Sequence, residues 1–170
     1  SELAPGTGSV AGSREAGSDS RGATALIVGA GGAASAIAFA LGQAGARRIG
    51  IHDIDAARRD QLLAQLGMHD LDAFAWNGLD TRDAGLLVNA SPLGMRAGDP
   101  LPVPADALHA GLWVADVIMA PAVTPLLEAA QARGCRTHEG RHMMEWQLGL
   151  MADFFTPDIE AVEAARRERP

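Results

Sequence analysis

The chain of 170 residues carries 14 basic and 21 acidic side chains, which give a formal net charge of −7. This length allows one domain with a sizeable core, and the negative charge argues against a nucleic-acid-binding surface. No apolar run reaches the roughly 18 residues of a membrane-spanning helix, and no leader segment opens the chain, so a cytoplasmic protein is expected. The single cysteine, Cys135, cannot form an internal disulfide, and no cysteine and histidine cluster has metal-site spacing.

The first 22 residues are rich in glycine, serine and alanine and predict a linker or hinge remnant. From Ala23 onward, short apolar runs alternate with longer segments. Strands are expected, in chain order, within residues 24–29, 47–54 and 73–76, at the start of 85–95 and of 112–121, and within 135–140. Helices are expected from the glycines after residue 29 to near Gly45, then over residues 55–67, 124–134 and 142–155.

This order of elements predicts the α/β class. A parallel sheet covered on both faces and joined by right-handed crossovers gives a doubly wound parallel-sheet Rossmann domain with three layers, α/β/α. We expect this domain to span residues 23–157 and a C-terminal helical tail to span residues 158–170.

A glycine-rich segment follows the first predicted strand. It consists of Gly29, Ala30, Gly31, Gly32, Ala33 and Ala34, and it fits the pattern G-x-G-x-x-A. Gly29 permits the tight turn, Gly31 lets the backbone approach a pyrophosphate, and Ala34 keeps helix and strand close together. The helix N-terminus offers unpaired N–H groups to an anion. The alternative is a tight strand–helix turn that binds no ligand.

Asp53 ends the second predicted strand, 22 residues beyond Gly31. An acid at that point can bind both hydroxyls of the adenosine ribose and repel a 2′-phosphate, so NAD is favoured over NADP. Arg58 and Arg59 follow on the next predicted helix, too far along to serve a 2′-phosphate. The alternative is that Asp53 merely caps this helix, although Asp55 is equally well placed to do so.

Three later stretches carry a family resemblance: VNASPLGM at 88–95, VADVIMAPAVTPLL at 114–127 and GCRTHEGRHMMEWQLGLMADFF at 134–155. They resemble the N-A-[ST]-P-x-G-M loop, the D-V-x-Y-x-P-x-x-T-x-L-L segment and the G-x-x-M-x-x-x-Q helix of the shikimate/quinate dehydrogenase family. With the glycine loop, the resemblance covers residues 23–157. Asp53 points to the NAD-using, shikimate dehydrogenase-like subgroup. The resemblance implies an oxidoreductase of aromatic amino acid biosynthesis or quinate metabolism, transferring hydride between NAD(P) and a cyclic hydroxy acid such as shikimate.

The family also implies roles for residues that follow the predicted strands. Gln147 is expected to bind substrate, unless the backbone satisfies its amide. Met119 and Ala120 depart from the family pattern, which usually has tyrosine and often asparagine there, so the substrate is open. The remaining cofactor-binding candidates, which lie along the nicotinamide half, are Asn89, Ser91, Met95, Val117, Ile118, Gly140 and Met143.

Hydride transfer from an alcohol needs a group that accepts the hydroxyl proton. In the family a Lys–Asp pair has this role, and the lysine comes from a separate N-terminal substrate domain. All basic residues of this chain are arginines, and Pro5 stands where ELAPGTGSVAG at 2–12 would match the family's aspartate. We therefore expect a cofactor-binding domain without catalytic residues, nearly inactive when isolated.

The alternative function is a non-catalytic dinucleotide-binding or sensing module. The N-A-S-P-L-G-M loop and the M-x-x-x-Q helix argue against a methylene-tetrahydrofolate dehydrogenase or a glutamyl-tRNA reductase. The expected partners are NAD(H) and, when a substrate domain is supplied, a small cyclic hydroxy acid. Neither nucleic acid nor membrane is expected. An isolated domain of this kind exposes an apolar face, so a homo-oligomer is expected.

Overall fold

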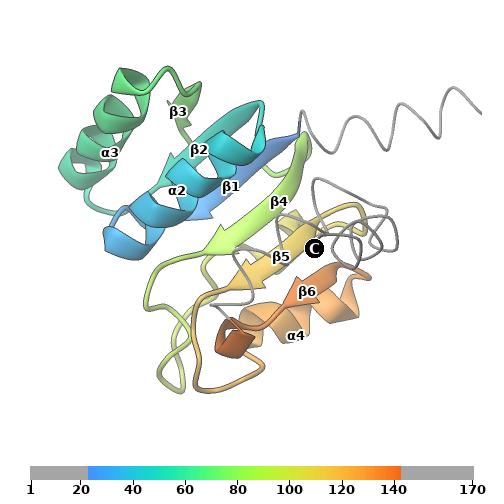
Figure 1. Cartoon of the computed structure of the whole chain (residues 1–170). Coiled ribbons are helices and arrows are strands. Elements are labelled where there is room, and N and C mark those ends of the chain that lie inside the picture. The colour runs from blue at the N-terminus through green and yellow to red at the C-terminus, as the bar shows by residue number, and fades with distance from the viewer. Residues whose placement is uncertain (1–22, 143–170) are drawn as a thin grey trace, which may run out of the picture.

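The structure is a computed structural model that describes residues 23–142 (Figure 1). The predicted linker at 1–22, the tail at 158–170 and the candidates Met143 and Gln147 lie outside the described residues. The strands are β1 (Thr24–Val28), β2 (Arg48–His52), β3 (Ala73–Ala75), β4 (Ala84–Asn89), β5 (Trp113–Asp116) and β6 (Arg136–His138). The helices are α2 (Gly32–Ala44), α3 (Ala56–Met68) and α4 (Pro125–Ala132), with short 3₁₀ turns η2 (Ala105–Ala107) and η3 (Gly140–His142).

The six strands form one parallel sheet in the order β3-β2-β1-β4-β5-β6. The strand order reverses between β1 and β4, which is the switch point of a doubly wound sheet. Ligands of such sheets bind beyond the carboxyl ends of the strands at this point. The predicted α/β class and the parallel Rossmann-type sheet are therefore confirmed.

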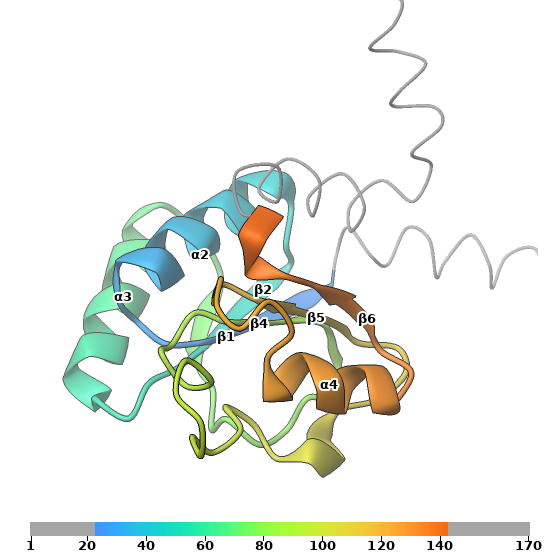
Figure 2. The same ribbon diagram turned by 90° about the horizontal axis from the view of Figure 1, so that it is seen from below.

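Strand β1 shows why the sheet is covered on both faces. All five of its residues are buried. Ala25 and Ile27 pack with α2 and α3, whereas Leu26 and Val28 pack with α4 on the other face. Because successive side chains of a strand point to opposite faces, a continuous apolar run fits a strand between two layers. Figure 2 shows α2 and α3 on one side of the sheet and α4 on the other.

Local sequence signals account for the ends of the helices. Gly45 ends α2 in the left-handed region, with φ of 104°, as its position predicted. The side chain of Thr124 caps α4 by accepting a hydrogen bond from Leu127 N, and Pro125 occupies the first turn. Asp55 caps α3. Gly67 does not stop α3, which continues to Met68.

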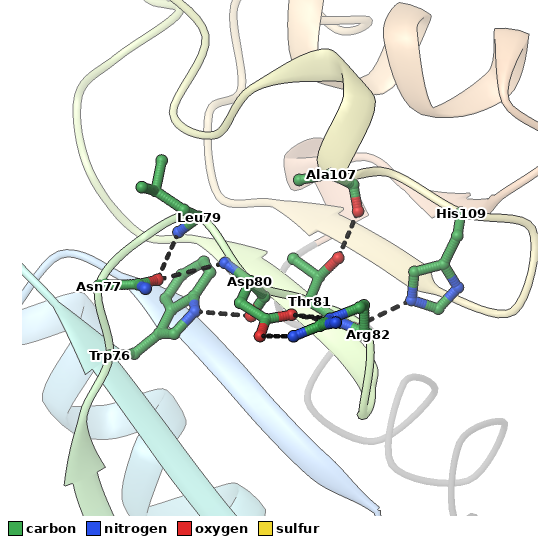
Figure 3. Close-up of polar contacts among 8 residues, drawn as sticks. All are labelled: Trp76, Asn77, Leu79, Asp80, Thr81, Arg82, Ala107 and His109. Carbon is green, nitrogen blue, oxygen red and sulfur yellow. Dashed lines mark hydrogen bonds and ion pairs between the residues drawn. The ribbon is translucent and has the colours of Figure 1, made fainter.

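The expected alternation of strands and helices is incomplete. Within residues 23–142, the β3–β4 connection has no helix, and the β4–β5 connection has only η2. Hydrogen bonds hold the β3–β4 connection instead, as Figure 3 shows: Trp76 Nε1 donates to Asp80 O at 2.8 Å, and the guanidinium of Arg82 donates two bonds to the Asp80 carboxylate. Thr81 Oγ1 donates to Ala107 O, and His109 Nε2 donates to Thr81 O at 3.0 Å, which ties this connection to the segment before β5.

Candidate functional site

The loops that leave the carboxyl ends of β1, β4 and β5 are each bonded, through their first residue, to the last residue of a neighbouring strand at one edge of the sheet. This places the predicted loops at 29–34, 89–95 and 117–121 side by side across the switch point. The same edge receives η3, because the backbone of residues 117–118 lies against Gly140. The backbone bonds that join these loops to the ends of neighbouring strands are Gly29 N to His52 O at 2.6 Å, Ala90 N to Val28 O at 2.8 Å and Val117 N to Asn89 O at 3.1 Å.

Gly29 makes the turn between β1 and α2, and two observations explain why the residue is glycine. Its φ is +109°, a value that side chains disfavour. A Cβ atom at this position would also lie 2.9 Å from Ala90 O, in the loop after β4. The tight-turn role predicted for Gly29 is confirmed, and the close approach to Ala90 is an additional constraint.

The N-terminus of α2 presents unpaired backbone donors to open space. Gly31 is its N-cap, with no side-chain cap and no acidic residue in the first turn. A Cβ atom added at Gly31 or Gly32 would meet nothing within 4 Å. Ala34, by contrast, is fully buried in the core, which confirms its helix–strand packing role. An uncapped, accessible helix N-terminus is a ready site for a phosphate group.

A hollow of about 400 Å³ lies beside the glycine loop, between α2 and α3. Arg58, in the first turn of α3, lines this hollow, so it lies nearer the glycine loop than its place in the sequence suggested. Arg59 instead pairs with Asp60 at 2.9 Å. The hollow therefore brings together the first turns of α2 and α3, a proximity that sequence distance alone did not indicate. The lining residues are Ala30, Gly31, Gly32, Ser35, Arg58, Gln61, Leu62 and Gln65.

Asp53 connects the end of β2 to the glycine loop. Its Oδ2 accepts a hydrogen bond from Ala30 N at 2.8 Å, and its Oδ1 accepts one from Asp55 N at 2.8 Å. The cap of α3 is Asp55, whose Oδ1 accepts from Ala57 N and Arg58 N. A carboxylate offers about four acceptor positions, so Asp53 keeps capacity for further donors such as ribose hydroxyls.

The loop after β4 is built around Asn89, whose side chain is fully buried. Its Nδ2 donates to Leu93 O at 2.9 Å, and its Oδ1 accepts from Ser91 N at 3.1 Å and from Ser91 Oγ at 2.6 Å. The buried amide therefore shapes the loop from within. Farther along, Asp99 Oδ2 accepts from Gly94 N and Arg96 N, and these bonds lower the pKa of Asp99.

Asp116 ends β5, and its fully buried carboxylate joins three segments. Oδ1 accepts from Ile118 N at 3.0 Å, and Oδ2 accepts from Thr124 Oγ1 at 2.8 Å. Asn89 Nδ2 donates to both oxygens, at 3.2 and 3.3 Å. Burial raises the pKa of Asp116, and the hydrogen bonds from Ile118, Thr124 and Asn89 oppose that rise.

The other candidates at this edge differ in exposure. Ile118 and Gly140 are buried, and a Cβ atom at Gly140 would lie 2.5 Å from Ile118 O and 2.6 Å from Val117 O. Met95 and Met119 project outward, with 59% and 58% of their surface exposed. The edge therefore combines closely packed backbone at Gly140 with two exposed apolar side chains.

Sequence reasoning assigned no role to Asp116 or Thr124. The signal was present, because a threonine followed by proline predicts a helix N-cap, and a polar residue that ends a buried apolar strand needs partners. Within residues 23–142, no group of three or more histidine, cysteine, aspartate or glutamate side chains is placed to hold a metal ion. No helix in that same range is long and apolar enough to cross a membrane.

The fold and this edge define a Rossmann-type α/β domain with an uncapped helix N-terminus at its switch point. No family model matches the chain. A curated relative, the shikimate dehydrogenase (NADP(+)) of Rubrobacter xylanophilus, is 40% identical over 168 residues, which cover 94% of this chain and 59% of the relative. The chain belongs to the shikimate/quinate dehydrogenase family.

Solved structures agree with this assignment. The Listeria monocytogenes shikimate 5-dehydrogenase, in complex with shikimate and NAD, matches with a TM-score of 0.66 and 31% identity over 89% of this chain and 57% of that one. The 5-ketofructose reductase of Gluconobacter matches with a TM-score of 0.66 and 32% identity, over 81% of this chain and 52% of that one. The Corynebacterium glutamicum quinate dehydrogenase, in complex with NAD, matches with a TM-score of 0.64 and 30% identity, over 79% of this chain and 50% of that one. The chain thus spans little more than half the length of the proteins it matches.

Proposed function

We propose that this chain is the dinucleotide-binding domain of a shikimate/quinate dehydrogenase-like oxidoreductase. The observation that carries the proposal is the uncapped N-terminus of α2, which opens on free space at the switch point beside Asp53. Relatives solved with NAD or NADP bound support it. The substrate would be a small cyclic hydroxy acid, since the matched proteins include shikimate and quinate dehydrogenases.

The residues divide the site into two halves. The N–H groups of Gly31 and Gly32 would bind the pyrophosphate, and Asp53 would accept hydrogen bonds from the adenosine ribose. The other half would then extend over the loops after β4 and β5, along Ser91, Met95, Val117, Ile118 and Gly140, with Asn89 supporting the first of these loops. Met143 and Gln147 belong to this proposal by family resemblance. A bound nicotinamide dinucleotide supplies the hydride acceptor or donor.

For the cofactor itself, we propose a preference for NAD. In this proposal the carboxylate of Asp53 would face a ribose 2′-phosphate, and the two negative groups would repel each other. Two observations weigh toward NADP: the curated relatives carry NADP(+) in their names, and Arg58 lines the hollow beside the glycine loop. The proposed preference means that repulsion of a 2′-phosphate by the Asp53 carboxylate exceeds its attraction by the Arg58 guanidinium.

By family resemblance, the group that accepts the hydroxyl proton would be a lysine paired with an aspartate, and this sequence contains no lysine. We propose that the 170-residue chain binds the dinucleotide and oxidises shikimate negligibly by itself. The same observation favours the second candidate function, a dinucleotide-binding module without its own chemistry. We propose self-association through the face that would meet a substrate domain or through an edge strand of the sheet, and the exposed apolar side chains of Met95 and Met119 support it.

The test is a calorimetric titration with NADH and with NADPH of the wild-type chain, Asp53→Asn and Arg58→Gln. Asp53→Asn removes the charge and keeps an acceptor for Ala30 N, while its NH₂ group replaces the oxygen that accepts from Asp55 N. Because the charge is gone, we expect the NADPH-to-NADH affinity ratio to rise about tenfold. Arg58→Gln lowers that ratio if Arg58 faces the 2′-phosphate. A wild-type preference for NADPH that Asp53→Asn leaves unchanged refutes the cofactor assignment, and binding of neither dinucleotide refutes the function.

A further inference from the structure

The buried carboxylate of Asp116 lies at the junction of the loops that form the second half of the site. Every bond described for it is donated by a neutral group: Ile118 N, Thr124 Oγ1 and Asn89 Nδ2. The side chain is fully buried. A buried charge balanced only by neutral donors is unfavourable, so its presence calls for an explanation beyond packing.

Each partner of Asp116 controls a different segment. Asn89 fixes the loop after β4 through Ser91 and Leu93. Thr124 accepts from Leu127 N at 3.3 Å and so sets the start of α4. Ile118 lies in the turn whose backbone contacts Gly140. One carboxylate therefore determines how three segments meet.

These segments lie on one side of the switch point. The glycine loop and Asp53 belong to β1 and β2, whereas the partners of Asp116 belong to β4, β5 and α4. No bond described for Asp116 reaches the glycine loop. A dinucleotide that places its ribose at Asp53 and its pyrophosphate at α2 must extend its other end over the loops that Asp116 holds.

We propose that Asp116 is a positioning residue for the nicotinamide half of the site, an inference that rests on the proposed function. It holds the loops at 89–93 and 117–118 in the arrangement that receives the nicotinamide, and it leaves the adenosine half unaffected. An amide at position 116 would replace one acceptor by an NH₂ group facing the donors of Asn89, Thr124 or Ile118. The loops would have to separate to relieve that contact.

The experiment compares binding of a ligand that has the nicotinamide group with binding of one that lacks it. NADH and ADP-ribose, which lacks nicotinamide, are titrated into the wild-type 170-residue chain and into Asp116→Asn, with the thermal midpoint of each variant recorded. We expect Asp116→Asn to weaken NADH binding about tenfold and to change ADP-ribose binding less than about twofold. Equal weakening of both ligands, or no change in either, overturns the proposal.

A second pair of variants covers the outcome in which Asp116→Asn does not fold. Thr124→Val removes the hydroxyl that donates to Asp116, and Thr124→Ser keeps it with one methyl group fewer. The proposal predicts weaker NADH binding for Thr124→Val, recovery in Thr124→Ser, and unchanged ADP-ribose binding in both. Equal loss in the two variants overturns it. If the wild-type chain binds ADP-ribose but Asp116→Asn still binds NADH normally, only this inference fails. If the wild-type chain binds neither ligand, the proposed function is refuted as well.

Discussion

Substitution of Gly29 by alanine tests whether the glycine loop has the geometry described. Two terms make Gly29→Ala destabilising. An L-residue at φ of +109° is strained by about 1–3 kcal/mol. The new Cβ atom would lie 2.9 Å from Ala90 O, and relief of that overlap costs about 1–3 kcal/mol more. The expected loss is therefore about 2–6 kcal/mol, a large part of the about 5–15 kcal/mol that stabilises a domain of ordinary size.

Urea unfolding followed by tryptophan fluorescence measures this loss, and Gly31→Ala is the matched control. Gly31 has φ of −84° and a Cβ atom there meets nothing within 4 Å, so its stability should change by less than about 0.5 kcal/mol. Its NADH affinity should nevertheless fall about tenfold, because the added methyl group occupies the approach of the pyrophosphate. Equal stability of Gly29→Ala and wild type, or equal destabilisation of both variants, refutes the reasoning.

Three further predictions concern the surroundings of the site. Gly140→Ala places a Cβ atom 2.5 Å from Ile118 O, so we expect unfolding to become easier by about 1–3 kcal/mol and NADH affinity to fall more than ADP-ribose affinity; an unchanged urea midpoint contradicts this. Asp55→Ala removes the cap of α3 and should reduce stability by about 1 kcal/mol in the same assay, whereas Asp55→Asn should retain most of it; equal losses argue against capping. Burial raises the pKa of Asp116 above 3.8, so the folded chain binds this proton more tightly than the unfolded chain. The stabilisation from this tighter proton binding is complete at pH values below the pKa of Asp116 in the unfolded chain. It is lost as the pH rises through the pKa of Asp116 in the folded chain. The stability of wild type relative to Asp116→Asn should therefore decrease from about pH 4 toward neutral pH, and a constant difference would be inconsistent with it.

Much of the fold was predictable because the signals are local. Apolar runs such as that of β1 identify buried strands, and Gly45, Asp55 and Thr124 mark helix ends through their own backbone and side-chain chemistry. The contacts of the connection between β3 and β4 were harder to anticipate. No helix was predicted there and none is present in this described segment, but hydrogen bonds among Trp76, Asp80 and Arg82 hold the connection, and no sequence pattern indicated them.

The site was predictable in outline and less so in its contacts. The glycine pattern and Asp53 follow from spacing, and the structure joins them through Ala30 N. The position of Arg58 depended on how α3 turns back toward α2, which spacing does not give. The contact between Asn89 and Asp116 links residues 27 positions apart, and the Gly29–Ala90 approach depends on β1 and β4 being neighbours. Such contacts follow from the strand order, and the sequence pattern alone leaves that order open.

The central claim is that the chain binds a nicotinamide dinucleotide through the N-terminus of α2. The most direct test is a titration of the 170-residue chain with NADH, followed by energy transfer from tryptophan to the nicotinamide ring. The account predicts that NADH binds saturably and one-to-one, that ADP-ribose displaces the bound NADH, and that Gly31→Ala weakens NADH binding. Absence of transfer up to about 1 mM NADH, the upper end of ordinary affinities for such ligands, would contradict it.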